Sequence, residues 1–372
     1  MTTVLATGAW LKSRDALWRD GRWELSAEHG DLSTPAACDA LAASCEALLA
    51  RAGGRVDAVA HDLHPDFFST RLAKALATRL GTRAFEVQHH HAHVAAVMAE
   101  HGVDGPVVGL ALDGVGLGID GRTWGGEVLV VDASGWQRVG HLMPLALPGG
   151  DRAAVEPWRM AAAALHALGR RDEIASRFAP KVGAAPAEGV AEMLLKGLNC
   201  PPSSAAGRWF DAAAGMLGVS LRQEHEAQAA VALEALAAGE HAEGESMPLP
   251  VRAGVIDHRP LMRRLLELAE ADRTAEGAAL FHRSLGDALV AAAARAAAQA
   301  GCRQVALAGG CFVNRMLSAR VERGLAAHGL TALRARELPC GDAGLAVGQA
   351  WVAARALATD PVSRELEAAP CA

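Results

Sequence analysis

Alternating and periodic apolar positions predict that the first hundred residues form a small α/β unit. Short apolar runs bounded by turn residues are typical of strands, and longer runs with helical periodicity are typical of helices. Asp20-Gly21 between apolar flanks predicts a hairpin turn, and Ser33-Thr34-Pro35 predicts a helix start. The predicted elements are strands at 3–7, on both sides of Asp20-Gly21, at 56–60 and at 83–87, with helices at 33–49 and 65–80. Their order is β-β-β-α-β-α-β.

The rest of the chain repeats this order around a long interruption. The predicted elements are strands at 107–112, 127–132, 136–142, 304–308 and 331–336, with helices at 277–300, 314–328 and 344–356. The interruption, about 144–275, has a mostly helical pattern with loops near 200–202 and 243–250. Two copies of one unit predict a duplicated α/β fold, with a first lobe at 1–102, a second at 103–372 and a cleft between them.

The amino-acid composition limits the classes of protein to which this chain can belong. With 51% hydrophobic residues in 372, the chain can bury large cores, yet no apolar run reaches the ~18 residues of a membrane span. The start of the chain lacks a signal-peptide pattern, so we expect a cytoplasmic protein. A net charge of −6 argues against a nucleic-acid partner. The seven cysteines include no pair spaced two apart, and we expect reduced thiols.

Four histidines follow the strand at 83–87 and begin a helical segment. Residues four apart share a helix face, so His89 and His93 are predicted to lie side by side while His91 points elsewhere. Asp113 and Asp342 each follow a predicted strand. Two histidines with one or two aspartates are a common ligand set for a catalytic metal. The alternatives are a solvated polar turn for the histidines and a helix N-cap for Asp342.

Two glycine-rich segments are candidates for anion binding. The first, between two predicted strands, begins with Asp113, Gly114 and Gly116, and its backbone can approach a phosphate closely. The second has Gly309 and Gly310 between a strand and a helix, where the helix dipole and free amides favour an anion. Asn314 follows and is a candidate contact for a nucleotide's sugar or phosphate. A simple turn is the alternative for the first segment.

Several longer motifs resemble the C-terminal part of the HypF carbamoyltransferases of nickel–iron hydrogenase maturation. They cover nearly the whole chain: 62–66 (DLHPD), 88–93 (QHHHAH), 113–127, 148–152 (PGGDR), 203–212 (SSAAGRWFDA), 281–282, 309–315 (GGCFVNR) and 342–344 (DAG). The resemblance implies the actin/hexokinase-like (ASKHA) duplicated fold of the related TsaD proteins. The acylphosphatase domain, zinc-finger motifs and YrdC-like domain of the full-length family are not visible, so we expect a short form or an excised domain.

The resemblance also implies a chemistry and a ligand set. Carbamoyl adenylate, made from carbamoyl phosphate and ATP, would place its AMP part over Gly309, Gly310 and Asn314 and its phosphate near the Asp113 hairpin with Gly114 and Gly116. One divalent metal, iron or zinc with Mg²⁺ as a further candidate beside the nucleotide, would be held by His89, His93, Asp342 and Asp113. His89, His93 and Asp342 are thereby the implied catalytic residues.

The implied acceptor is the C-terminal cysteine thiolate of HypE, and a separate protein is a candidate source of the adenylate. Lys12 and Arg208 are candidate phosphate contacts, with surface roles as the alternative, and His64 and His282 either line the cleft or are buried structural histidines. Two other functions remain open: a small-molecule O-carbamoyltransferase and a non-catalytic nucleotide-binding scaffold.

Overall fold

The computed structural model describes residues 2–239 and 244–359. Its first sheet consists of the five strands that were predicted in the first hundred residues. Its strand order is β3-β2-β1-β4-β5, with β1 antiparallel to β2 and parallel to β4. The elements of this part are β1 (Thr3–Ala6), β2 (Ala16–Arg19), β3 (Arg22–Leu25), α1 (Pro35–Arg51), β4 (Ala58–Asp62), α2 (Phe68–Leu80) and β5 (Arg83–Val87). Asp20 and Gly21 both have positive φ, 49° and 84°, as a two-residue hairpin turn requires, and Thr34 caps α1.

The second sheet repeats the first. Its central order β8-β7-β6-β13-β14 has the same antiparallel and parallel pairings as β3-β2-β1-β4-β5, which confirms the predicted duplication. The elements of this repeat are β6 (Val107–Leu117), β7 (Thr123–Asp132), β8 (Gly135–Leu142), α11 (Thr274–Ala300), β13 (Gln304–Ala308), α12 (Arg315–Ala327), β14 (Thr331–Arg334) and α13 (Leu345–Thr359). Short 3-10 turns η2 (Gly310–Val313) and η3 (Asp342–Gly344) precede α12 and α13.

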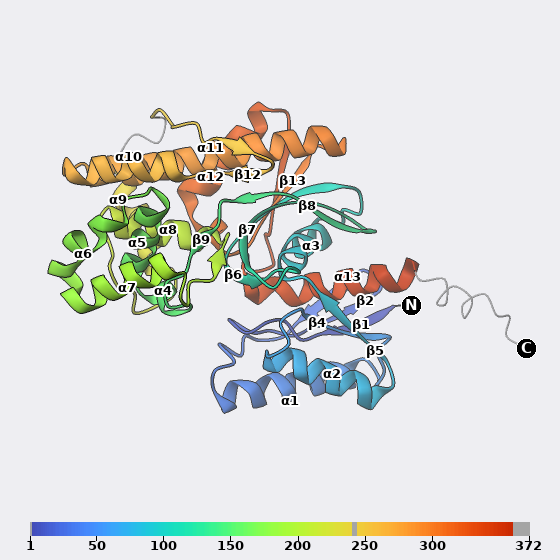
Figure 1. Cartoon of the computed structure of the whole chain (residues 1–372). Coiled ribbons are helices and arrows are strands. Elements are labelled where there is room, and N and C mark those ends of the chain that lie inside the picture. The colour runs from blue at the N-terminus through green and yellow to red at the C-terminus, as the bar shows by residue number, and fades with distance from the viewer. Residues whose placement is uncertain (1, 240–243, 360–372) are drawn as a thin grey trace, which may run out of the picture.

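Two helices lie between the sheets, as Figure 1 shows: α3 (His89–His101) and α13. They pack closely because Gly348 of α13 has no side chain; a Cβ there would lie 1.8 Å from the carbonyl oxygen of Ala92 in α3. Helix α3 also packs on β6 and β13, and α13 on β1 and β4. The two helices thus cross between the parts of the chain: α3, which precedes residue 102, packs on the second sheet, and α13, which follows it, packs on the first.

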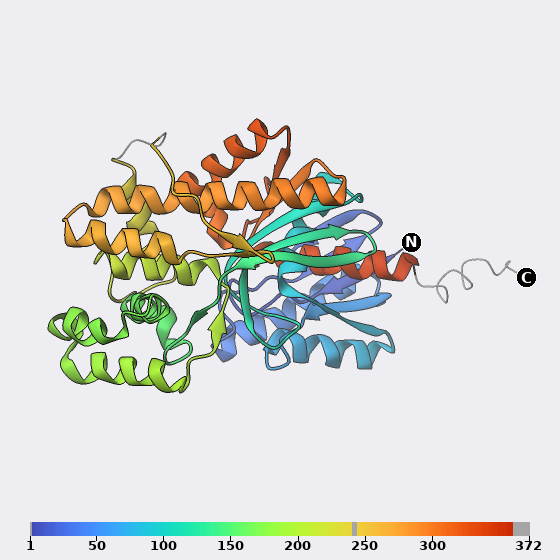
Figure 2. The same ribbon diagram turned by 45° about the horizontal axis from the view of Figure 1, so that its top comes forward.

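The interruption is mostly helical, as predicted, and it also extends the second sheet. The turned view in Figure 2 shows its helices gathered at one end of that sheet. The elements are β9 (Leu145–Ala146), α4 (Arg152–Val155), α5 (Pro157–Ala167), η1 (Arg171–Glu173), α6 (Ile174–Val182), α7 (Ala184–Lys196), β10 (Pro202–Ser203), α8 (Ala206–Met216), α9 (Gln228–Ala237), β11 (Val251–Arg252), β12 (Val255–Ile256) and α10 (Arg259–Glu270). Strand β12 pairs with β8, which the helical pattern did not predict.

Other expectations concern loops, thiols and membranes. Residues 244–250 form no helix or strand, as predicted, while Glu243 lies outside the described residues. The described cysteines are free thiols. Across residues 2–239 and 244–359, no helix combines the length and the apolar character needed to cross a membrane.

Candidate active site

Four side chains from three distant parts of the chain converge between the two sheets. His89 and His93 come from α3, Asp113 from β6, and Asp342 from η3. One potential ligand atom of each lies within 4.8 Å of the others. The structure thus brings together all four residues that were predicted as metal ligands.

Helix geometry positions the two histidines. Helix α3 begins directly after β5, and the Gln88 side chain caps it by accepting a hydrogen bond from the His91 amide at 2.9 Å. At a spacing of four residues, the Nε2 atoms of His89 and His93 lie 3.2 Å apart. Both side chains are almost fully buried. Two buried imidazole nitrogens facing one point form half of a metal site.

The two carboxylates come from separate elements of the second repeat, Asp113 from β6 and Asp342 from η3. The pairing of β6 with β7 shifts register between Leu112 and Gly116, and Asp113 lies in this irregular stretch. Its Oδ2 lies 3.3 Å from Nε2 of His89 and 3.5 Å from Nε2 of His93. Asp342 Oδ1 lies 3.6 and 3.4 Å from the same two nitrogens. Asp342 is the first residue of η3, and the N-cap position of that turn is Gly341.

The charges of the cluster favour a cation at its centre. Burial by itself lowers the pKa of His89 and His93, but the surrounding carboxylates outweigh it and raise both, that of His89 well above its ordinary value. Burial conversely raises the pKa of Asp113 and Asp342, yet the two imidazoles hold both below their ordinary values. The same arrangement suits a divalent metal, which displaces the imidazole protons when it binds. The donor set therefore fits iron or zinc.

Asp62, at the end of β4, supports this cluster and was not predicted to have a role. Its Oδ2 lies 2.7 Å from Nδ1 of His89, and its Oδ1 accepts a hydrogen bond from the His64 amide at 2.9 Å. A carboxylate behind a ligating histidine keeps the proton on Nδ1 and leaves Nε2 free for a metal. Two sequence signals pointed to it: the 62–66 motif (DLHPD) begins with Asp62, and Asp62 ends a strand that is parallel to its neighbours.

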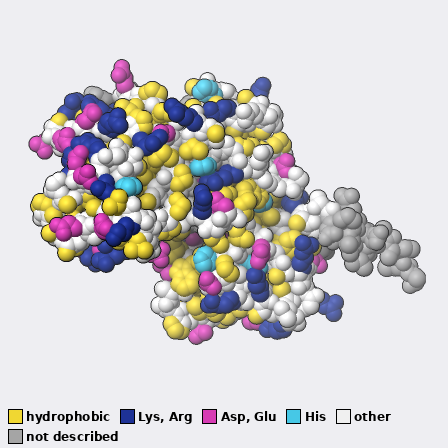
Figure 3. All heavy atoms as spheres, in the orientation of Figure 1, with side chains coloured by type: hydrophobic (Ala, Val, Ile, Leu, Met, Phe, Trp, Pro, Cys, Tyr) yellow, Lys and Arg dark blue, Asp and Glu magenta, His cyan; other side chains and the backbone are white. Residues whose placement is uncertain are grey.

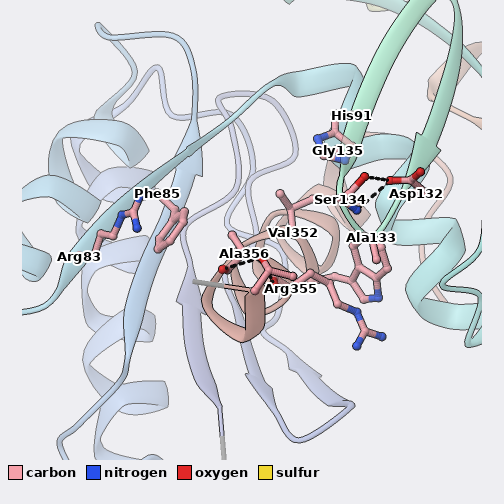
Figure 4. Close-up of a pocket in the computed structure, with 12 residues that line it drawn as sticks. Arg83, Phe85, His91, Asp132, Ala133, Ser134, Gly135, Val352, Arg355 and Ala356 are labelled. Carbon is pink, nitrogen blue, oxygen red and sulfur yellow. Dashed lines mark hydrogen bonds between the residues drawn. The ribbon is translucent and has the colours of Figure 1, made fainter. Parts of the chain in front are cut away.

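His91 points away from the cluster, as expected, whereas the His90 ring lies beside it, with its centroid 5.2 Å from that of the His89 ring. The Gln88 side chain pairs with Nδ1 of His90 at 3.0 Å, and Trp124 lies beside its ring. His91 lines a separate cavity of about 290 Å³ bounded by β5, the β7–β8 turn and α13, as Figure 4 shows. Burial lowers the pKa of His91 to about 4, so this imidazole is neutral.

A larger cavity of about 370 Å³ adjoins the cluster at Asp113. Of the residues predicted to bind nucleotide, Asp113, Gly114, Gly310 and Asn314 line it. In the space-filling view of Figure 3, a notch separates the larger upper part of the molecule from the smaller lower part, with histidine side chains at its edge. A pocket of this size suits a small-molecule ligand.

Gly116 and Gly309, which were predicted to contact the nucleotide, are tightly packed in the structure. A Cβ on Gly116 would lie 2.6 Å from His90 Cε1 and 2.7 Å from His89 Cδ2, so this glycine makes room for the histidine rings. Gly309 has φ +92°, and a Cβ there would lie 2.3 Å from the carbonyl oxygen of Leu112. Both glycines therefore serve packing around the cluster, and neither is among the described residues that line the cavity.

The predicted anion site at the start of α12 already holds a carboxylate. Glu234 of α9 accepts hydrogen bonds from the amides of Arg315 at 2.7 Å and Met316 at 3.1 Å. Asn314 uses its Oδ1 to cap the helix and its Nδ2 to contact His282, which is buried. Asn314 keeps one amide hydrogen for a ligand. Sequence reasoning missed Glu234 because it lies in a different helix.

Charged side chains that line the cavity form ion pairs. Arg208 contacts Asp211 at 2.9 Å, and burial raises the pKa of Asp211 to about 6. Lys12 contacts Glu226 at 2.7 Å across the two halves. All four residues line the cavity, as expected for Lys12 and Arg208. His64 is half-buried and stacks on Phe67.

Comparison with known families gives two matches. The family model described as "HypF Kae1-like domain" matches residues 1–100, and the model described as "Carbamoyltransferase, Kae1-like Domain, second subdomain" matches residues 109–349. A Cupriavidus necator protein named carbamoyltransferase HypF homolog is 58% identical, with 99% of this chain and 96% of that protein aligned. HypF2 of the same organism is 48% identical over 94% of this chain but only 46% of its own length.

Solved structures agree with these matches. Full-length HypF in its phosphate- and nucleotide-bound form aligns with a TM-score of 0.88 at 31% identity, over 96% of this chain and 46% of that one. HypF of T. kodakarensis aligns with a TM-score of 0.89 at 31% identity, over 96% of this chain and 48% of that one. The chain thus spans about half the length of HypF2 and of both solved proteins. The predicted duplicated actin/hexokinase-like fold is confirmed.

Proposed function

Because the chain belongs to the HypF carbamoyltransferase family, we propose that it transfers a carbamoyl group from carbamoyl adenylate to the C-terminal cysteine thiolate of HypE. The product, a thiocarboxamide, would serve the synthesis of the cyanide ligands of a nickel–iron hydrogenase. One observation carries the proposal: Asp113 belongs both to the cluster of metal-ligand side chains and to the wall of the large cavity. A nucleotide in that cavity would therefore present its phosphate end to the cluster.

The residues of the chain have distinct tasks in this reaction. His89, His93, Asp113 and Asp342 would hold a divalent metal, which when bound supplies Lewis-acid polarisation of the carbamoyl oxygen. Asp62 holds His89 in the tautomer that a metal needs. Gly114, Gly310 and Asn314 line the space for the AMP part. Burial of the cluster keeps water away and strengthens its electrostatic interactions.

The proposed donor and acceptor of the carbamoyl group imply two partner proteins. A separate adenylate-forming protein would make carbamoyl adenylate from carbamoyl phosphate and ATP, and HypE would present its C-terminal thiolate in the cytoplasm. The net charge of −6 favours a protein acceptor over a nucleic acid, because phosphate backbones are bound by clustered positive charge.

Mass spectrometry of HypE tests the proposal. The metal-loaded chain, a YrdC-like adenylate-forming protein, carbamoyl phosphate and ATP should add one carbamoyl group to HypE, and HypE without its terminal cysteine should stay unmodified. Asp342→Asn should abolish the transfer. A chain that leaves HypE unmodified but carbamoylates a sugar hydroxyl would be a small-molecule carbamoyltransferase. Salt-sensitive tRNA binding without HypE binding would instead place it with the tRNA-modifying relatives.

A further inference from the structure

Lys12 reaches the large cavity from the opposite half of the molecule. It lies in the loop between β1 and β2, whereas of the other described residues that line this cavity only Glu28 comes from the first half. Its Nζ contacts Oε2 of Glu226, which precedes α9 in the insertion, at 2.7 Å. This ion pair therefore joins the two halves at the cavity.

The backbone at Lys12 is held in an unfavourable conformation. Its φ of 45° lies in the left-handed region, which residues with a side chain rarely adopt. The loop is fixed there because the Lys12 amide donates to Asp31 Oδ1 at 3.0 Å and the Ser13 amide donates to the Gly30 carbonyl at 2.9 Å. Strain that surrounding contacts impose is concentrated at binding sites. Here it directs a long cationic side chain into the cavity.

Lys12 and Arg208 are the basic residues among the described residues that line the large cavity. They differ in how easily each can leave its carboxylate partner for a ligand. Arg208 pairs with Asp211, whose side chain is only 3% exposed, and removing one partner of a buried pair is costly. Lys12 and Glu226 are 50% and 59% exposed, and such a surface pair contributes little stability. Lys12 can therefore leave Glu226 for a ligand at small cost.

The charges around Lys12 also favour a ligand phosphate. Burial by itself lowers the pKa of Lys12, but Glu226, Asp342 and Asp113 outweigh it and raise the pKa, so the ammonium group stays charged. A phosphate placed beside the cluster would lie close to the carboxylates of Asp113 and Asp342. Lys12 already experiences both carboxylates, so together with a metal in the cluster it would offset that repulsion.

We infer that Lys12 exchanges Glu226 for the phosphate of the bound adenylate and stabilises this phosphate as it leaves. The inference rests on the proposed carbamoyl transfer. In that step the acceptor thiolate forms a bond to the carbamoyl carbon, and the bond from this carbon to the phosphate oxygen breaks. The electron pair stays on the oxygen, so the phosphate of AMP gains one negative charge without proton transfer. Lys12 stabilises this charge and thus contacts the leaving group directly.

Titration calorimetry with AMP and adenosine tests the role of Lys12. Lys12→Gln should weaken AMP binding about 10- to 100-fold, as expected for the loss of a charged hydrogen bond, and should leave adenosine binding unchanged. Lys12→Arg should recover part of the AMP affinity. Glu226→Gln should bind AMP at least as tightly as the parent, because the competing carboxylate is gone. In transfer assays, Lys12→Gln should lower kcat and leave the KM for HypE unchanged.

Lys12→Gly separates a functional role from a structural one. Glycine accepts the positive φ without strain, so this variant should melt at a higher temperature than the parent while losing AMP affinity as Lys12→Gln does. If Lys12→Gln keeps the parent's ratio of AMP to adenosine affinity, the role of Lys12 is wrong and the proposed transfer stands. If the parent itself binds neither AMP nor adenosine, the proposed nucleotide site fails, and the role of Lys12 fails with it.

Discussion

Replacing Asp62 by Asn should weaken metal binding although Asp62 is not itself a ligand. Both carboxylate oxygens accept hydrogen bonds, one from the His64 amide and one from Nδ1 of His89. An Asn side chain has one acceptor oxygen and one NH₂ group, so it must turn its NH₂ toward one of these two donors. When it faces His89, it favours the tautomer with the proton on Nε2, where the metal ligand is needed.

The size of the effect follows from the buried geometry. The contact between Asp62 and His89 is 2.7 Å long and almost fully buried. A hydrogen bond to a charged group contributes about 1.5–3 kcal/mol, which corresponds to roughly 10- to 100-fold in metal affinity. His89→Ala removes a ligand itself and should cost more than Asp62→Asn.

Competition with a chromophoric chelator measures these affinities for Zn²⁺, with melting temperature as the check on folding. His91→Ala is the matched control, because His91 is buried in the same helical turn but lines a different cavity. It should bind metal as the parent does. Parent-like affinity in Asp62→Asn, or an equal loss in His91→Ala, would refute the proposed orientation of His89.

Three further predictions concern pH, the glycines and Asp342. The pKa values of His89 and His93 lie above their ordinary 6.5 when no metal is bound, so metal affinity, measured by the same competition, should rise as the pH increases above 6.5. In the metal-free protein, protonation of these imidazoles stabilises the fold below pH 6.5, so its melting temperature should fall as the pH rises through their raised values. Gly310→Val should keep the fold but weaken AMP binding in calorimetry, since a Cβ there meets only Asp113 Oδ1, at 3.4 Å. Gly309→Ala should lower the melting temperature strongly, because its Cβ would lie 2.3 Å from a carbonyl oxygen. Asp342→Asn should retain the fold in circular dichroism yet lose metal in elemental analysis, because it removes one of the two carboxylate charges.

The sequence alone determined the local structure, and it was sufficient to name the four candidate metal ligands. Strand and helix periodicities, with the Asp20-Gly21 turn and the Thr34 cap, placed most elements within a few residues of their observed bounds. The pairing of His89 with His93 needs only the geometry of one helix, so spacing was sufficient to predict it. Repetition of the element order was likewise sufficient to predict the duplicated fold.

Only the tertiary structure showed that the predicted aspartates contact the histidines and which further residues support the site. Asp113 and Asp342 meet the histidines because β6 pairs with β13 and because α3 packs on α13, and no local pattern encodes such contacts. For the same reason, the supporting role of Asp62 and the carboxylate of Glu234 at the start of α12 were not predicted. The sequence does not show whether a glycine faces a ligand or a neighbouring histidine ring. The packing around Gly116 and Gly309 distinguishes them from Gly114 and Gly310, because only the folded chain shows which atoms a side chain would meet.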